Sequence, residues 1–192
     1  MQKTPFLNHS RRLKSASTVT IFLEKHMHKV IIADVRKCMA CRTCEIVCAW
    51  AHSKSGTLEE AMKGQPRVNV EAAQDFAIPM LCRHCEDAPC IRICPTGALH
   101  RQDLNGSVLI DQDLCIGCKL CLIVCPFGTI VPSYDGRTVL KCDLCQDRLE
   151  AGKEPACVVS CPMLALKFVE ADQYVQQKRM DATQCYIDKI GN

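Results

Sequence analysis

Sixteen of the seventeen cysteines fall into four runs of four, of which the third is the most regular. In this run Cys115, Cys118, Cys121 and Cys125 follow the spacing C-x2-C-x2-C-x3-C, and Pro126 comes next. This spacing is typical of chains in which three thiolates bind one [4Fe-4S] cluster and the fourth binds a neighbouring cluster. Such a run therefore needs a partner run. The other runs are Cys38, Cys41, Cys44 and Cys48; Cys82, Cys85, Cys90 and Cys94; and Cys142, Cys145, Cys157 and Cys161.

The runs differ in the width of their gaps and in how they end. The second run widens its middle gap with residues 86–89, and the fourth contains a long excursion over residues 146–156. Proline follows the last cysteine of the second, third and fourth runs, where it ends a short helix and turns the chain. The first run continues with Ala49 and Trp50 instead, so we expect Trp50 and the polar segment 52–64 to turn the chain there.

Cysteine content and composition favour bound metal. Seventeen cysteines among 192 residues indicate either a disulfide framework in a secreted protein or metal binding in a reducing compartment. The closely spaced C-x2-C pairs at the start of each run suit the corners of a metal cluster better than disulfide bonds between distant residues. Aromatic residues make up only 5% of the chain, and Trp50 is the single tryptophan. Because so little large apolar surface is available, bound clusters must supply much of the interior.

The net charge gives no indication of a nucleic-acid partner. The formal value of +3 counts every cysteine as neutral. An oxidised [4Fe-4S] cluster with four thiolates carries about −2, so four of them would bring the total to roughly −5. The basic residues near the cysteines either compensate cluster charge or form ordinary solvated loop surface: Lys37, Arg42, Arg83, Arg92, Lys119 and Lys141.

Strand, cluster loop, short helix and strand form a repeating unit along the chain. Strands are expected over residues 28–34, 67–70, 106–111, 128–131 and 165–169, with another starting near Leu99. A helix is expected over residues 57–62, with Thr57 as its N-cap. The tail over residues 172–190 is polar and compatible with a helix, with four side chains available for packing: Tyr174, Met180, Tyr186 and Ile190. No stretch approaches the roughly 18 apolar residues of a membrane span.

Residues 1–27 are expected to lie outside the fold, either as a disordered extension or because translation begins at Met27. The segment 10–14, with the sequence SRRLK, is similar to a twin-arginine export signal. The apolar stretch 19–23 is short, however, and ends in Glu24 and Lys25 without a small-residue cleavage site. A cytoplasmic and anaerobic setting is therefore favoured over export.

The four runs resemble those of the iron-sulfur subunits of the dimethyl-sulfoxide-reductase type. The resemblance covers roughly residues 28–170, and the phrases at 41–45 (CRTCE), 82–90 (CRHCEDAPC) and 141–145 (KCDLC) look like its soluble branch. It implies a small, loop-rich α+β fold of two pseudo-symmetric bacterial ferredoxin-like modules, each with two clusters. Runs one and four would form one module within residues 28–170, and runs two and three the other. Residues 171–192 would follow as a helical tail.

The resemblance also implies how sixteen cysteines share four [4Fe-4S] clusters. The fourth cysteine of each run would serve a cluster held mainly by its partner run. The implied ligands are Cys38, Cys41, Cys44 and Cys161 for cluster 1; Cys82, Cys85, Cys90 and Cys125 for cluster 2; Cys115, Cys118, Cys121 and Cys94 for cluster 3; and Cys142, Cys145, Cys157 and Cys48 for cluster 4.

The resulting functional hypothesis is an electron-transfer subunit that relays single electrons between a catalytic redox subunit and a second electron carrier. The resemblance implies partners of the carbon monoxide dehydrogenase, hydrogenase, formate dehydrogenase or aldehyde oxidoreductase type, and any membrane association would arise through them. No group of side chains is organised as a catalytic site, which disfavours an enzyme. A structural zinc-binding interaction module is the alternative, but zinc ribbons use two C-x2-C pairs with a long spacer.

Four residues outside the ligand sets could also contribute to function. Cys185 is expected to be a partly buried residue of the tail rather than an extra ligand or a redox thiol. His84, between Cys82 and Cys85, either donates a hydrogen bond to a cluster sulfur or faces a partner or solvent. His52 and His100 have no stronger indication of function.

Overall fold

The computed structural model describes residues 29–53, 56–102 and 106–190. The expectations for residues 1–27 lie outside these ranges. The strand expected over residues 28–34 is described from Lys29 on. The helices are α1 (Thr43–Ala51), α2 (Leu58–Lys63), α3 (Pro89–Ile93), α4 (Leu120–Val124), α5 (Gln146–Glu150), α6 (Ala156–Val159) and α7 (Ala171–Ile190). The strands are β1 (Lys29–Ala33), β2 (Asn69–Ala73), β3 (Phe76–Met80), β4 (Leu99–Arg101), β5 (Val108–Ile110), β6 (Val131–Pro132), β7 (Val139–Leu140) and β8 (Leu166–Glu170).

The strands form four antiparallel pairs, two of which connect the ends of cysteine runs. β1 pairs with β8, so the segment before the first run lies against the segment after the fourth. β4 pairs with β5, which turns the chain from the end of the second run into the start of the third. The pairs β2–β3 and β6–β7 are hairpins between runs. The topology therefore associates run one with run four and run two with run three.

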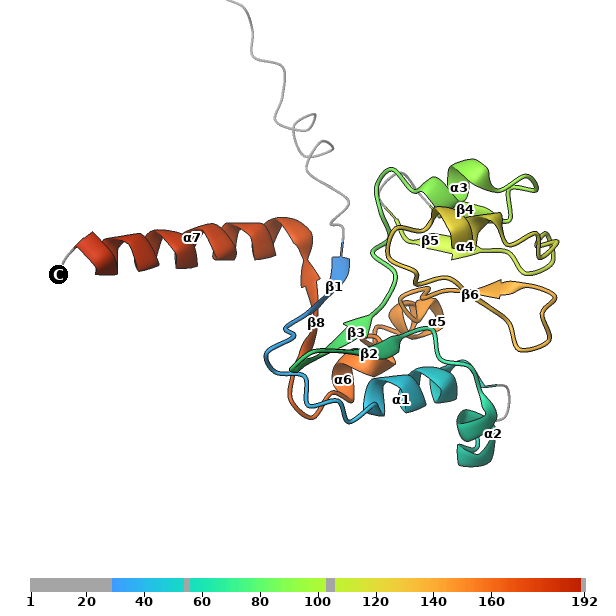
Figure 1. Ribbon diagram of the computed structural model, residues 1–192, viewed down its shortest axis with the longest axis horizontal. Coiled ribbons are helices and arrows are strands. Elements are labelled where there is room, and N and C mark those ends of the chain that lie inside the picture. Colours follow the sequence, from blue (N-terminus) through green and yellow to red (C-terminus); the bar gives the residue numbers. More distant parts are fainter. Residues whose placement is uncertain (1–28, 54–55, 103–105, 191–192) are drawn as a thin grey trace, which may run out of the picture.

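Two separate groups of buried apolar side chains follow from this topology. The first group gathers Ile31, Val70, Leu81 and Leu166 with cysteines of the first and fourth runs. The second gathers Leu99, Val108, Ile130 and Val139 with cysteines of the second and third runs. In Figure 1, α3, α4, β4 and β5 lie at one end, and α1, α6, β2 and β3 lie at the other. Cysteine side chains are thus part of both interiors.

Most of the expected elements are present. Helix α2 covers the expected segment, and its N-cap is confirmed because the Thr57 hydroxyl accepts a hydrogen bond from the Glu60 N–H at 3.3 Å. The strand expected at 67–70 begins later, at Asn69, and continues into a hairpin with β3 that was not predicted. The turn of this hairpin contains Gln74 with φ of 52°, a conformation for which glutamine gives no sequence signal.

The end of α1 shows how the first run turns without proline. The indole N–H of Trp50 donates to the carbonyl oxygen of Gly56 at 2.7 Å, and the Ser53 hydroxyl donates to the Trp50 carbonyl at 2.8 Å. Gly56 has φ of 67°, which a residue with a side chain adopts only at a cost. The expectation that Trp50 takes part in this turn is confirmed.

The C-terminal tail forms the expected helix, but the partial burial expected of Cys185 is wrong. Helix α7 extends away from the two groups of elements (Figure 1), and none of its residues is buried. Tyr186 and Ile190 are 69% and 84% exposed, and Cys185, expected to be partly buried, is exposed. Polar residues occupy most of its circumference, so it has no continuous apolar face to bury. Within the described part of the chain, no helix is both long and apolar enough to cross a membrane.

Candidate iron-sulfur cluster sites

The C-x2-C turns of all four runs share one backbone feature. The residue before the second cysteine has a positive φ in each: Ala40 at 59°, His84 at 48°, Gly117 at 64° and Leu144 at 60°. For a residue with a Cβ atom this conformation costs about 1 to 2 kcal/mol. The same conformation at the same position of all four runs, strained in the three that have a side chain there, indicates loops that curl around a common kind of ligand.

Backbone N–H groups donate to several of the cysteine sulfurs. In the second and fourth runs the same contact recurs, from the N–H two residues after the first cysteine. The bonds are His84 N to Cys82 Sγ at 3.4 Å, Leu144 N to Cys142 Sγ at 3.4 Å, Ala165 N to Cys161 Sγ at 3.3 Å and Arg67 N to Cys48 Sγ at 3.3 Å. Such bonds stabilise thiolates and help to set the potential of an iron-sulfur cluster.

Two cavities are each lined by four cysteines from two different runs. Three cysteines come from one C-x2-C-x2-C segment and the fourth from the end of the partner run, which matches the implied ligand sets of clusters 1 and 3. One cavity is lined by Cys38, Cys41, Cys44 and Cys161, and the other by Cys94, Cys115, Cys118 and Cys121. Cys41 and Cys118 are exposed, so both cavities lie near the surface.

The other eight run cysteines form two further gatherings. Burial raises the pKa of Cys157, and the nearby thiols of Cys142, Cys48 and Cys145, followed by that of Cys44, raise it further, which places the first four together. Burial also raises the pKa of Cys90, with Cys82 and Cys125 adding to the effect. Cys85, Cys90 and Cys125 pack against the same apolar group. These two gatherings correspond to the implied sets of clusters 4 and 2.

The thiol pKa values differ between the interior and the surface. Burial raises the pKa of Cys44 to about 11 and that of Cys121 to about 11, so the free thiols are protonated at neutral pH. The exposed Cys41 has a lowered pKa because the Thr43 hydroxyl and backbone N–H donate to its sulfur. Iron ligation requires thiolates, so loading the buried positions must release protons.

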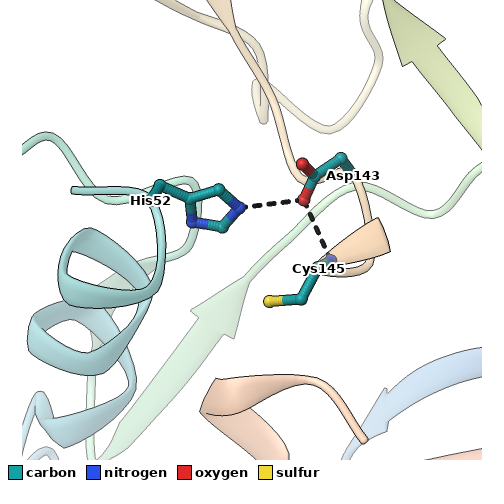
Figure 2. A group of neighbouring side chains, drawn as sticks. All are labelled: His52, Asp143 and Cys145. Carbon is teal, nitrogen blue, oxygen red and sulfur yellow. Dashed lines mark hydrogen bonds and ion pairs between the residues drawn. The ribbon is translucent and has the colours of Figure 1, made fainter. Parts of the chain in front are cut away.

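A polar network adjoins the deeper set of the first and fourth runs (Figure 2). His52 Nδ1 lies 2.7 Å from the Cys48 carbonyl oxygen, and its Nε2 lies 3.1 Å from Asp143 Oδ1. Arg67 also donates to Asp143, which in addition accepts the Cys145 N–H at 2.9 Å. The network therefore joins α1, the segment before β2 and the fourth run.

The nearness of His52, Asp143 and Cys145 does not make a separate metal site, although their ligand atoms lie within 4.8 Å of one another. Burial alone would lower the pKa of His52, but its hydrogen bonds with the Asp143 carboxylate and with the Cys48 sulfur, 3.8 Å from Nδ1, outweigh burial and raise it to about 10. Both ring nitrogens then carry protons and face acceptors. An imidazolium has no lone pair for a metal, so these residues form an ion-pair network that supports the cysteine loop.

Replacing Asp143 with asparagine should destabilise the iron-loaded protein by about 3 kcal/mol, because Arg67 and His52 would both lose their carboxylate partner. The raised pKa of His52 makes its contribution fully present below its ordinary value of 6.5, and the contribution is lost as the pH rises through about 10. The difference between wild type and Asp143→Asn should therefore shrink over this interval. Guanidinium titrations at several pH values would measure it.

The matched control is Asp75→Asn, at an exposed position in the turn between β2 and β3. It should leave the denaturation midpoint unchanged across the same pH range. A difference for Asp143→Asn that stays constant up to pH 10 would show that His52 does not take part as described.

Sequence reasoning named His84 and Lys141 beside the cysteines but did not predict that both are buried. His84 is only 2% exposed, and its Nδ1 accepts the Val108 N–H at 3.0 Å, so of its two expected roles the partner-facing or solvent one is wrong. Lys141 is 1% exposed and hydrogen-bonded inside the protein, whereas the other five basic residues near the cysteines are exposed. The local sequence does not predict this burial, because both residues stand in cysteine loops. His100 is exposed, with Nδ1 near the Ala98 carbonyl oxygen at 3.3 Å.

Comparison with known proteins also indicates iron-sulfur clusters. Residues 73–171 match the family described as the 4Fe-4S dicluster domain. An iron-sulfur protein of Rhodospirillum rubrum is 42% identical over 163 residues, which cover 76% of this chain and 84% of that protein. The putative electron transport protein YsaA of Escherichia coli K12 is 39% identical over 80% of this chain and 97% of its own length. The B subunit of the anaerobic dimethyl sulfoxide reductase of the same organism is 36% identical over 73% of this chain and 72% of its own length.

Strained cysteine loops, N–H···S bonds and these relatives define an iron-sulfur protein of the electron-transfer class, and not a catalytic subunit. The chain belongs to the 4Fe-4S dicluster family. The resemblance to the iron-sulfur subunits of the dimethyl-sulfoxide-reductase type is confirmed. The zinc-binding alternative gains no support from the family or the relatives.

Proposed function

We propose that this chain is a four-cluster electron relay, with its sixteen run cysteines holding four [4Fe-4S] clusters in the crossed sets given above. The observation that carries the proposal is the pair of cavities lined by three cysteines of one run and the last cysteine of another. The gathering of Cys48 with Cys142, Cys145 and Cys157 supports a third set, and that of Cys82 with Cys90 and Cys125 supports a fourth. When bound, each cluster would accept and release one electron.

The proposal includes two related modules within residues 28–170. One contains the β1–β8 pair with α1 packed on α6, and the other contains the β4–β5 pair with α3 packed on α4. The separate apolar groups around these pairs support this division. Residues 171–192 would be a tail outside both modules, and residues 1–27 would play no part in electron transfer.

The inner sets of the two modules face each other in this proposal. Among the causes that raise the pKa of Cys142, after its burial, is the thiol of Cys82 from the other module. The outer sets contain the exposed Cys41 and Cys118. Electrons would therefore enter near one outer set, pass the inner pair and leave near the other.

The exposed side chains around the outer sets support contacts with protein partners there. Met39 and Met163 border the cavity of cluster 1 and are 60% and 45% exposed, while Ile116 borders that of cluster 3 and is 66% exposed. We propose a catalytic redox subunit at one end and a second electron carrier at the other. Carbon monoxide dehydrogenase, hydrogenase, formate dehydrogenase and aldehyde oxidoreductase are the proposed types of catalytic partner, and the cytoplasm is the proposed compartment.

Reductive titration of the anaerobically prepared protein tests the relay. The broad absorption near 400 nm should bleach, with uptake of about four electrons per chain, one for each cluster. Uptake of about two electrons would contradict a four-cluster relay. A colourless protein that takes up none would instead favour structural zinc.

A further inference from the structure

Lys141 is a buried cation without a carboxylate partner among the residues that the structure describes. Its side chain is only 1% exposed. Moving an ammonium group out of water costs several kcal/mol unless nearby negative charge and hydrogen bonds compensate. The position of Lys141 therefore requires an anion that the side chains near it do not provide.

The hydrogen bonds of Lys141 place its ammonium group between the two modules. Nζ donates to the Cys142 carbonyl oxygen at 2.7 Å, which belongs to the fourth run. It also donates to the carbonyl oxygen of Val108 in β5, which lies in the apolar group of the second and third runs. His84, between two cysteines of the second run, accepts the N–H of the same Val108.

The ammonium group of Lys141 has proposed ligands on both sides. Cys142, whose carbonyl oxygen it contacts, belongs to the proposed set of cluster 4. Val108, whose carbonyl oxygen it also contacts, lies in the apolar group against which Cys85, Cys90 and Cys125 of the proposed set of cluster 2 pack. The two inner sets are therefore the nearest sources of negative charge for the buried ammonium.

We propose that Lys141 is a positioning residue whose fixed positive charge, buried between the ligands of clusters 2 and 4, stabilises the reduced state of both. The inference rests on the four ligand sets proposed above. Reduction adds one electron and no proton, so the charge of a cluster with its thiolates goes from about −2 to about −3. A fixed cation in a poorly hydrated interior favours the more negative state.

Lys141 then differs in kind from the exposed basic residues near the cysteines. Lys119 stands directly after Cys118 but is exposed, so water and salt screen its charge. Arg92 is exposed and pairs with Asp87 at 3.1 Å. Burial therefore decides between the two interpretations of these basic residues. The buried Lys141 compensates cluster charge, and the exposed residues form solvated surface.

The test is a potentiometric titration of the iron-loaded protein, followed by electron paramagnetic resonance, for wild type and three variants. Lys141→Gln keeps an N–H donor and removes the charge, Lys141→Arg keeps the charge, and Lys119→Gln removes an exposed charge next to a ligand. The signals of clusters 2 and 4 are identified as those altered by Cys90→Ser and Cys157→Ser.

In Lys141→Gln, the reduced-to-oxidised ratio of clusters 2 and 4 at a given potential should fall about tenfold, equivalent to about 59 mV for one electron. Clusters 1 and 3 should keep their potentials, and Lys141→Arg and Lys119→Gln should leave clusters 2 and 4 near wild type. Wild-type potentials for all four clusters in Lys141→Gln would overturn the inference. Equal shifts in Lys141→Arg and Lys141→Gln would also overturn it.

If Lys141→Gln fails to retain iron, Lys141→Arg decides. Full iron content and wild-type potentials in the arginine variant would support a role for charge, whereas loss of iron there too would overturn it in favour of a steric role. Failure of the four-cluster proposal would be seen in the wild-type protein, before any variant is compared.

Discussion

Replacing Cys161 with serine is expected to alter the cluster held by Cys38, Cys41 and Cys44, although Cys161 lies at the end of the fourth run. The reason is that Cys161 lines the same cavity as the first three cysteines of the first run. Serine retains a smaller, harder oxygen in place of the thiolate, so the cluster should be lost or its spectrum changed. Electron paramagnetic resonance of the reduced variant would show the change, because Cys41→Ser should alter the same signal.

The matched comparison uses the other module. Cys125→Ser should alter the same signal as Cys82→Ser and leave the signal sensitive to Cys41→Ser intact. The crossed sets would be contradicted if Cys161→Ser and Cys142→Ser altered one common signal while Cys41→Ser altered a different one. The fourth run would then hold a cluster by itself, and the order of the relay would change.

Replacing Gly117 with alanine should destabilise the iron-loaded protein by about 2 to 5 kcal/mol. Gly117 lies between Cys115 and Cys118 with φ of 64°, which already costs about 1 to 2 kcal/mol for alanine. A Cβ atom there would also overlap the backbone carbonyl oxygen of Arg137, which cannot move aside as a side chain can. Overpacking of this kind typically costs about 1 to 3 kcal/mol, which adds to the cost of the backbone conformation.

Gly136→Ala is the control for backbone strain alone. Gly136 has φ of 71°, but nothing lies within 4 Å of the position its Cβ would take. This variant should lose only about 1 kcal/mol and keep all its iron. The loss of cluster absorption in guanidinium would compare the two variants. Equal midpoints for Gly117→Ala and Gly136→Ala would show that the contact with Arg137 is unimportant.

Regular spacing made much of the site predictable. The C-x2-C-x2-C pattern fixes which cysteines share a tight turn, because ligand geometry leaves little freedom within so short a loop. Helix α2 was predictable because a threonine that can cap its N-terminus comes directly before a segment of helix-forming residues. The crossing of the runs was implied by the family resemblance and remains a proposal, which the β1–β8 pairing and the four-cysteine cavities support.

The features that sequence reasoning missed depend on contacts between distant residues. Asp143 meets His52 and Arg67 across 91 and 76 residues, and no local pattern in the sequence announces such a network. Strand β3 contains Pro79, which argues against a strand, yet Pro79 is accommodated in a two-stranded pair. Lys141 stands directly between β7 and Cys142, and its hydrogen bond to Val108 in β5, 33 residues away, could not be predicted from the local sequence.

Iron and acid-labile sulfide analysis of the anaerobically prepared chain tests the four-cluster relay most directly. The crossed sets use all sixteen run cysteines, so the protein should contain about 16 iron and 16 sulfide per chain. A reproducible content near 12 would contradict the full set and would point to the site that contains the long excursion between Cys145 and Cys157. Zinc in place of iron, without sulfide, would contradict the electron-transfer function itself.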